Sequence, residues 1–157
     1  MSNQVNSGYR LNVAMIVLNQ ENKVLFCKRK NTSNWQFPQG GVDDDEDLTK
    51  AMYRELNEEV GLDFDQVKIK SESKNLIYYD IPSNLRSRVL GGKYKGQAQK
   101  YYLLHHISGE IDLNKEHHPE FDEFNWVPFW YPLGQVVDFK KEAYRKALIE
   151  FKDHVNK

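Results

Sequence analysis

The sequence predicts an α/β fold in which helices cover a central mixed β-sheet. Two observations lead to this class. β-rich runs come before, between and after two segments with helical periodicity, an order typical of an α/β sandwich. The chain has 157 residues, 39% hydrophobic and 29% charged, so one domain over residues 1–157 can bury a core without disulfides or a structural metal.

The expected strands are short runs rich in β-branched and aromatic residues. They lie at residues 9–18, 23–30, 67–71, 76–80, 97–107 and 124–127. The first two are separated by the turn-like Asn19-Gln20-Glu21-Asn22, which suggests a hairpin. Between the second and third strands, residues 35–42 contain Pro38 and a Gly-Gly pair, so we expect a strand end that passes into a loop.

Helical spacing of apolar residues occurs twice. Residues 47–60 form the first expected helix, and Gly61 supplies its C-terminal stop. Its apolar stripe consists of Leu48, Ala51, Met52, Leu56 and Val60. The second helix is expected from Lys140 to about His154, with Ala143, Ala147, Leu148 and Phe151 on one stripe.

Composition narrows the class of protein. The net charge is −1, so no overall field attracts nucleic acid. The only cysteine, Cys27, rules out an internal disulfide, and its apolar surroundings predict a buried structural thiol. No run approaches the roughly 20 apolar residues of a membrane span, and residues 1–12 do not resemble a signal peptide. We therefore expect a cytoplasmic protein without membrane contact, whose aromatic residues (13%) provide rings for stacking against bases.

Charge is unevenly distributed along the chain. Residues 43–47 are an unbroken acidic run, whereas residues 81–100 contain no acid and five basic residues. These are Arg86, Arg88, Lys93, Lys95 and Lys100. Such runs are compatible with plain solvated faces, and equally with a cation site beside a groove for polyphosphate.

The most specific pattern is Gly40-x5-Glu46-x7-Arg54-Glu55-Leu56-x-Glu58-Glu59-x-Gly61-Leu62. At about 100° per residue, Glu55 and Glu59 lie one above the other on a helix, and Glu58 lies within one turn of both. Their mutual repulsion predicts a cation, and oxygen ligands favour Mg²⁺ or Mn²⁺ over zinc. The alternative is a solvated acidic face balanced by Arg54 and Lys50.

Residues 40–62 resemble a complete Nudix box. The resemblance implies a Nudix-type α/β/α sandwich and cleavage of a phosphate–phosphate anhydride with Mg²⁺, for which Mn²⁺ can substitute, and with more than one ion. By position, Glu55, Glu58 and Glu59 would be metal ligands, one of them doubling as base, and the Gly40 carbonyl would face the metal. Arg54 would orient a glutamate, and Glu46 would anchor the start of the helix.

Segments within and around the box are similar to bacterial RNA pyrophosphohydrolases, a group also described as dinucleoside polyphosphate hydrolases. These segments are residues 8–10, 35–41, 51–56, 119–122, 129–132 and 136–140. Enzymes of this group remove the terminal phosphates of triphosphorylated or diphosphorylated RNA, leaving a monophosphate and promoting mRNA decay. The alternatives are a hydrolase of Ap4A- or Ap5A-type substrates and a nucleotide-binding module without catalysis, although no box glutamate is missing. The sequence identifies no protein partner.

The same resemblance implies roles for residues outside the box. Glu120 would be a further metal ligand or base. The residues that would bind substrate are Arg29, Val137 and Phe139 around a base, Tyr79, Gln97 and Lys140 at phosphates, and Arg10 and Gln39 within the matching segments. The chain departs from the family pattern at Asp44-Asp45, where Pro-Gly is common, and at Asn34, where serine is common.

Several of these residues have a simpler structural interpretation. Phe139 could be a hydrophobic staple before the last helix, and Tyr79 a core residue of its strand. Lys140 could be a solvated lysine, although a cation at the start of a helix is unfavourable without a partner. His117 and His118 beside Glu120 suggest zinc only weakly, since adjacent histidines rarely bind one ion.

Overall fold

The computed structural model describes residues 4–155. In this part of the chain, eight strands form one mixed sheet with a central path β3-β2-β1-β7-β5. Three more strands pair off this path, β4 on β1, β6 on β7 and β8 on β2. The strands are β1 (Tyr9–Leu18), β2 (Lys23–Arg29), β3 (Trp35–Gln36), β4 (Gln39–Gly41), β5 (Val67–Glu72), β6 (Ile77–Asp80), β7 (Gly96–His106) and β8 (Phe121–Pro128).

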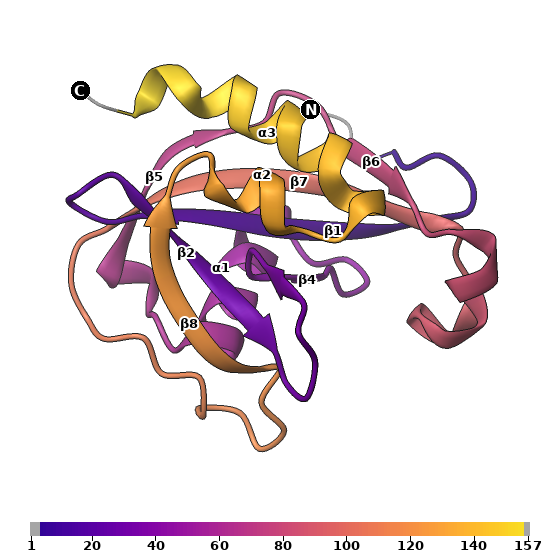
Figure 1. Ribbon diagram of the computed structural model, residues 1–157, viewed down its shortest axis with the longest axis horizontal. Coiled ribbons are helices and arrows are strands. Elements are labelled where there is room, and N and C mark those ends of the chain that lie inside the picture. The colour runs from indigo at the N-terminus through magenta and orange to yellow at the C-terminus, as the bar shows by residue number, and fades with distance from the viewer. Residues whose placement is uncertain (1–3, 156–157) are drawn as a thin grey trace.

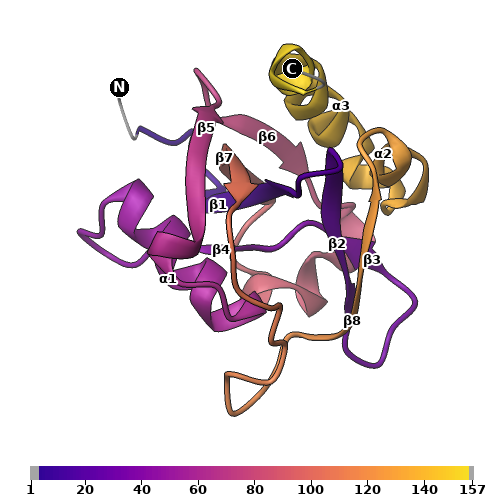
Figure 2. The ribbon, with the colours of Figure 1, turned by 90° about the vertical axis from the view of Figure 1, so that its left-hand side faces the viewer.

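Strand β1 lies at the centre because both faces of its apolar run are covered. It pairs in parallel with β7 from Tyr9↔Gly96 to Leu18↔His105. Its alternate side chains enter two different cores, Val13, Met15 and Val17 on one side and Ala14, Ile16 and Leu18 on the other. Helix α1 (Leu48–Val60) closes the first core and α3 (Lys141–Phe151) the second. Figures 1 and 2 show the two helices on opposite sides of the sheet, which confirms the α/β/α sandwich.

The two long helices bury the predicted stripes. In α1 the buried residues are Leu48, Ala51, Met52, Leu56 and Val60, and in α3 they are Ala143, Tyr144, Ala147, Leu148 and Phe151. The Asp47 side chain caps α1 by accepting from the amides of Thr49 and Lys50. Gly61 ends it at φ 77°, a left-handed conformation that glycine adopts without a Cβ penalty.

The expected hairpin exists only at its turn. The β1–β2 ladder consists of the single pair Leu18↔Val24, and β2 instead pairs with β8 from Lys23↔Pro128 onward. The reason is competition for β1, which pairs with β7 along one edge and with β4 along the other. The expected strand end at residues 35–42 is divided into β3 and β4 around Pro38, which has no amide to donate.

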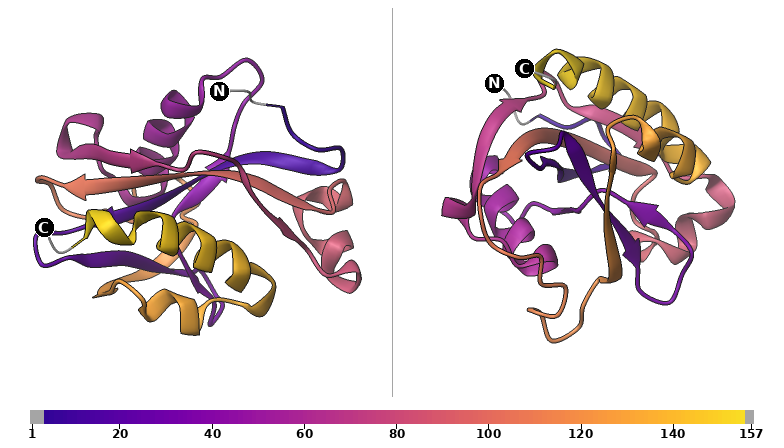
Figure 3. Two further views of the ribbon diagram at one scale, coloured as in Figure 1. Left: turned by 90° about the horizontal axis from the view of Figure 1, so that it is seen from above. Right: turned by 60° about the vertical axis from the view of Figure 1, so that its left-hand side comes forward.

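Short helical segments complete the described chain. They are the 3₁₀ turns η1 (Phe64–Gln66), η2 (Ser83–Arg88), η3 (Leu90–Gly92), η4 (Asp138–Lys140) and η5 (Lys152–His154), and the helix α2 (Tyr131–Gln135). The sequence did not predict η2, η3 or α2, and β8 begins at Phe121 rather than at the expected residue 124. Figure 3 shows the η2–η3 segment beyond the end of β6 and β7. No helix within residues 4–155 is long and apolar enough to cross a membrane.

Burial also affects ionisable side chains of the strands, among them Cys27 on β2 and Lys100 on β7. Cys27 is fully buried, as predicted, and burial raises the pKa of its thiol. Lys100 is also buried, with Nζ 3.0 Å from a carboxylate oxygen of Glu72 and bonded to the Ser73 carbonyl. It is therefore not part of a basic surface, which corrects the interpretation of residues 81–100 as one solvated or substrate-facing run.

Candidate active site

The Gly-Gly pair of β4 brings the backbone against α1. A Cβ atom at Gly40 would overlap the carboxylate of Glu55, and one at Gly41 would overlap the guanidinium of Arg10. Only glycine allows these two charged groups to lie against the strand. The close approach of β4 and α1 thus brings the Gly40 backbone next to Glu55, and the Gly41 backbone lies next to Arg10.

Arg54 fastens the loop to the helix. Its Nε and Nη2 donate to the two carboxylate oxygens of Glu46 at 2.8 and 2.9 Å, and Nη2 also donates to the Gly41 carbonyl at 3.0 Å. Its Nη1 donates to Glu55 at 3.0 Å and to Glu58 at 3.4 Å. This bidentate pairing lowers the pKa of Glu46 to about 2. Arg54 thus contacts the glutamates of the helix, and Glu46 is bonded to it just before the first helical turn.

The loop before Glu46 accommodates the Asp44-Asp45 departure in a specific way. Asp45 has a φ of 63°, in the left-handed region that favours glycine. Aspartate tolerates this conformation better than most residues. Asp43, which precedes this pair, lies 3.7 Å from Arg54.

Glu55 and Glu59 are carboxylates in an unfavourable environment. Burial raises the pKa of Glu55 to about 7, although Arg54 opposes the shift. Burial, and next the charge of Glu55, raise the pKa of Glu59 well above its ordinary value, with a smaller contribution from Glu120. The backbone amide of Gln39 donates to a carboxylate oxygen of Glu59 at 3.0 Å and orients the Glu59 side chain. Crowded, desolvated carboxylates of this kind are stabilised by a cation.

The donor chemistry fits a hard divalent cation. Glu55, Glu59 and Glu120 line one cavity together with Gly40, and oxygen donors are what Mg²⁺ and Mn²⁺ prefer. Glu58 does not line the cavity and is held beside Glu55 by Arg54. Within residues 4–155, no group of three acidic, histidine or cysteine side chains stands in metal-binding geometry, and Arg54 pairs with Glu55 and Glu58.

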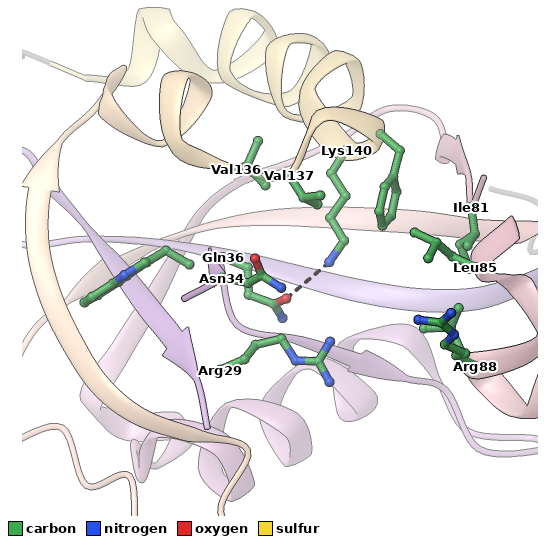
Figure 4. A pocket seen from close by; sticks show the side chains of 12 residues that line it. Arg29, Asn34, Gln36, Ile81, Leu85, Arg88, Val136, Val137 and Lys140 are labelled. Atoms are coloured by element: carbon green, nitrogen blue, oxygen red, sulfur yellow. Dashed lines mark hydrogen bonds between the residues drawn. The ribbon is translucent and has the colours of Figure 1, made fainter. Parts of the chain in front are cut away.

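The cavity has two compartments. The first, of about 380 Å³, is lined by the carboxylates together with basic and polar groups that include Arg10, Gln39 and Gln97. The second, of about 220 Å³, is mostly apolar and includes Trp35, Val136 and Val137 (Figure 4). Six residues line both compartments, namely Arg29, Ile81, Arg88, Val89, Phe139 and Lys140. A compartment lined by carboxylates and basic side chains thus adjoins a slot with aromatic and aliphatic walls.

A ladder of buried amides fixes the floor of the first compartment. Asn12 donates to the Gln39 side-chain oxygen at 2.8 Å and accepts from Gln99 at 2.8 Å. Gln97 donates to the Tyr79 hydroxyl at 2.7 Å, while its own side-chain oxygen is buried without a partner among the described residues. The ladder holds the oxygen of Gln39 inward, which leaves its NH₂ group to donate elsewhere.

Phe139 and Lys140 stand at the junction of the compartments. The Phe139 ring packs at 5.9 Å from that of Tyr79, so both residues are core neighbours as well as cavity walls. The Lys140 Nζ donates to Gln36 at 3.2 Å and lies 5.6 Å from the Tyr79 ring centre. Desolvation, and next the charge of Arg29, lower the pKa of Lys140 to about 8. The partner that a cation at this helix start requires is therefore Gln36.

Glu120 reaches the site from a loop. Its backbone carbonyl accepts from the Lys30 amide at 2.9 Å, and its side chain lies 3.7 Å from Arg29. Two residues later, Asp122 pairs with Lys28 at 2.6 Å and accepts from the Asn31 amide at 3.2 Å. These bonds to β2 and its following turn hold Glu120 facing α1 across the cavity.

Every substrate-binding residue expected from the sequence lines one of the two compartments. They are Arg10, Arg29, Gln39, Tyr79, Gln97, Val137, Phe139 and Lys140. Arg54 and Glu46 stand behind the site as a support. Sequence reasoning missed the wall formed by Ile81, Leu85, Arg88, Val89 and Leu90. In the sequence, the only signal for this wall was the basic run without acidic residues, which indicates charge but not where the side chains point. Asn34 keeps a place in the second compartment despite replacing the more common serine.

Comparisons with known proteins identify the family of this chain. The family model described as NUDIX domain matches residues 8–150. A protein of Francisella tularensis subsp. mediasiatica named RNA pyrophosphohydrolase is 48% identical over 151 residues, which cover 95% of this chain and 97% of that one. A protein of the same name from Pseudoalteromonas translucida is 44% identical over 146 residues, 92% of this chain and 85% of that one.

Solved structures show the same fold at low identity. The dihydroneopterin triphosphate pyrophosphohydrolase of E. coli has a TM-score of 0.70 and 20% identity, covering 90% of this chain and 98% of that one. An Ap4A hydrolase of C. elegans has a TM-score of 0.67 and 18% identity, covering 92% and 98%. The fold comparison places the chain among proteins with a Nudix-type α/β/α sandwich. The chain belongs to the Nudix family of hydrolases.

Proposed function

We propose that this Nudix hydrolase is a metal-dependent RNA 5′-pyrophosphohydrolase. It would convert the triphosphate or diphosphate end of RNA to a monophosphate and so promote mRNA decay in the cytoplasm. The proposal is supported by relatives of that name over nearly the whole chain. The structural observation that carries it is the junction between a carboxylate compartment and an apolar slot, which suits a phosphate chain followed by bases.

Different residues of the chain would hold the metal, accept the proton and bind the phosphates. Mg²⁺, or Mn²⁺ in its place, would be held by Glu55, Glu58, Glu59, Glu120 and the Gly40 carbonyl, with more than one ion involved. A bound ion supplies neutralisation of phosphate charge and a water of lowered pKa. A glutamate of the set would accept the proton of the attacking water, so that no protein nucleophile is needed. Arg10, Arg29 and Lys140 line the same compartment and would contact the phosphates.

The apolar slot is the base-binding part of the proposal. Phe139 presents a ring at its border, and Arg29 and Val137 line it with Phe139. The same slot could receive the second base of a dinucleoside polyphosphate, which keeps that substrate class as the second candidate. The two candidates share the metal chemistry and differ in the group attached beyond the phosphate chain.

The test compares three substrates in Mg²⁺, namely a triphosphorylated RNA of at least three nucleotides, dinucleoside tetraphosphate and GTP. We expect the highest kcat/KM on RNA and complete loss of activity with EDTA. Glu59→Gln should lower kcat on the order of 10²-fold or more. Its melting temperature should not fall, because glutamine has nearly the same shape as glutamate and its side-chain oxygen can still accept from the Gln39 backbone amide. A tenfold preference for the dinucleoside would overturn the RNA assignment, and near-normal turnover of Glu59→Gln would overturn the role of that residue.

A further inference from the structure

The five basic residues between Ile81 and Lys100 have different surroundings. Lys100 is buried, and the Lys95 Nζ lies 5.0 Å from the Tyr9 ring centre. The Arg86 Nε donates to the Ile81 carbonyl at 2.7 Å and so anchors the start of the segment. Lys93 is exposed and lines neither compartment of the cavity. Arg88 is the member of the run that lines both compartments.

The segment that carries Arg88 is fixed to the fold. Leu85 and Val89, on either side of it, pack against the core beneath α3, and both also line the apolar slot. After Val89 the chain turns through the left-handed residues Leu90, Gly91 and Gly92. The packing of Leu85 and Val89 thus holds Arg88 at the cavity edge, while the Arg88 guanidinium makes no hydrogen bond or ion pair within the described chain.

Arg88 is an exposed guanidinium without a protein partner. In residues 4–155 it forms no hydrogen bond or ion pair, in contrast to Arg54, which is engaged by carboxylates. Figure 4 shows Arg88, Arg29 and Lys140 approaching the cavity from three different elements. Three cations around one junction favour an anion there, and a free guanidinium is available to bind one in bidentate fashion.

The position of the junction identifies the anion, given the proposed function. In a triphosphorylated RNA the order is triphosphate, first nucleoside, phosphodiester, second nucleoside. With the triphosphate at the carboxylates and a stacked base in the slot, the phosphodiester between nucleotides 1 and 2 falls at the junction. We propose that Arg88 binds this phosphodiester and thereby selects RNA ends over free nucleotides. GTP has no phosphate at this position.

The test is a cycle that changes both partners. The substrates are a triphosphorylated trinucleotide with natural linkages, one with an uncharged methylphosphonate between nucleotides 1 and 2, and one with it between nucleotides 2 and 3. The enzymes are wild type, Arg88→Gln and Lys93→Gln, a charge-matched control on the same segment. On natural RNA, Arg88→Gln should lower kcat/KM about 10-fold, mainly through KM. Lys93→Gln should not.

The inference is judged by whether the change in the enzyme and the change in the substrate act independently. The methylphosphonate at the first linkage should cost wild type about the same 10-fold and cost Arg88→Gln little more, since the contact is already lost. At the second linkage the losses should multiply. The slope of log kcat/KM against log salt should become shallower by about 0.7 in Arg88→Gln. The melting temperature should not change, because the side chain has no protein partner.

Two outcomes overturn the inference in distinguishable ways. If wild type cleaves RNA but the losses multiply at the first linkage, Arg88 does not bind that phosphate and the proposed function stands. Stacking of Arg88 on a base would give this result. If wild type does not act on triphosphorylated RNA, both the proposed function and the role of Arg88 fall.

Discussion

Residues of one chemical type behave differently across this site. The carboxyl of Glu46 has a pKa of about 2 beside Arg54, whereas burial raises that of Glu55 to about 7. Glu59 is shifted in the same direction as Glu55. Arg54 pairs with both Glu46 and Glu55, so burial is what distinguishes them, and a cation beside Glu55 and Glu59 would favour their ionised forms.

Phe139 allows a prediction at this scale. A base stacked on an aromatic ring gains about 1–3 kcal/mol, so Phe139→Ala should reduce efficiency on triphosphorylated RNA by roughly 5- to 150-fold, mostly through KM. Hydrolysis of GTP, which has no second base, should change much less. Steady-state kinetics on RNA, dinucleoside tetraphosphate and GTP make the measurement.

Phe139 also packs against Tyr79, so stability must be followed in parallel. Phe139→Leu is the matched control, because it keeps most of the apolar volume and removes the ring. It should restore much of the melting temperature without restoring efficiency on RNA. Equal losses on all three substrates, together with a lower melting temperature, would show that Phe139 is only a packing residue.

Among the structural elements, α1 and the loop before it act as one unit. Glu46→Gln should reduce the free energy of unfolding by about 2 kcal/mol near neutral pH, since it removes charge-assisted bonds to Arg54. The pKa of Glu46 falls from an ordinary 4.5 to about 2 on folding. Its contribution is therefore complete above pH 4.5 and is lost as the pH falls toward 2.

Chemical denaturation from pH 7 to pH 2 measures this effect. Wild type and Glu46→Gln should differ most at neutral pH and converge in acid. Glu142→Gln is the control, because Glu142 pairs with Arg145 on the exposed face of α3 and such pairs stabilise little. A constant difference between wild type and Glu46→Gln at every pH would contradict the ionic role of Glu46.

The elements also show where sequence reasoning succeeds. Helix α1, its Gly61 stop and its glutamates were predictable because periodicity and spacing are local. The η2–η3 segment was missed, since its conformation depends on Leu85 and Val89 packing under α3, residues distant in sequence. The β2–β8 pairing was missed for a related reason, because ladders between remote strands leave no local pattern. Arg88 therefore had no predictable direction, although its charge was noted.

For the whole molecule, protection from hydrogen exchange should follow the layers. Strands β1 and β7 lie between two cores, and their amides are expected to exchange slowest, near the rate set by global unfolding. Amides of η2 and η3, which project beyond the sheet end (Figure 3), should exchange much faster. Exchange followed by NMR or mass spectrometry gives the order. Faster exchange in β1 than in η2 would contradict the central position of that strand.

The pairing of β1 with β7 also means that one strand is made on the ribosome well before its partner. Tyr9 pairs with Gly96, so 96 − 9 = 87 residues separate the partners along the chain. At about 5–20 residues per second, β1 has been made roughly 4–17 s before its neighbour. During that interval an apolar strand has an open edge, on which another nascent chain can pair. The strand expected to exchange slowest in the folded protein is therefore open to wrong pairing during translation, until β7 is made and pairs with it.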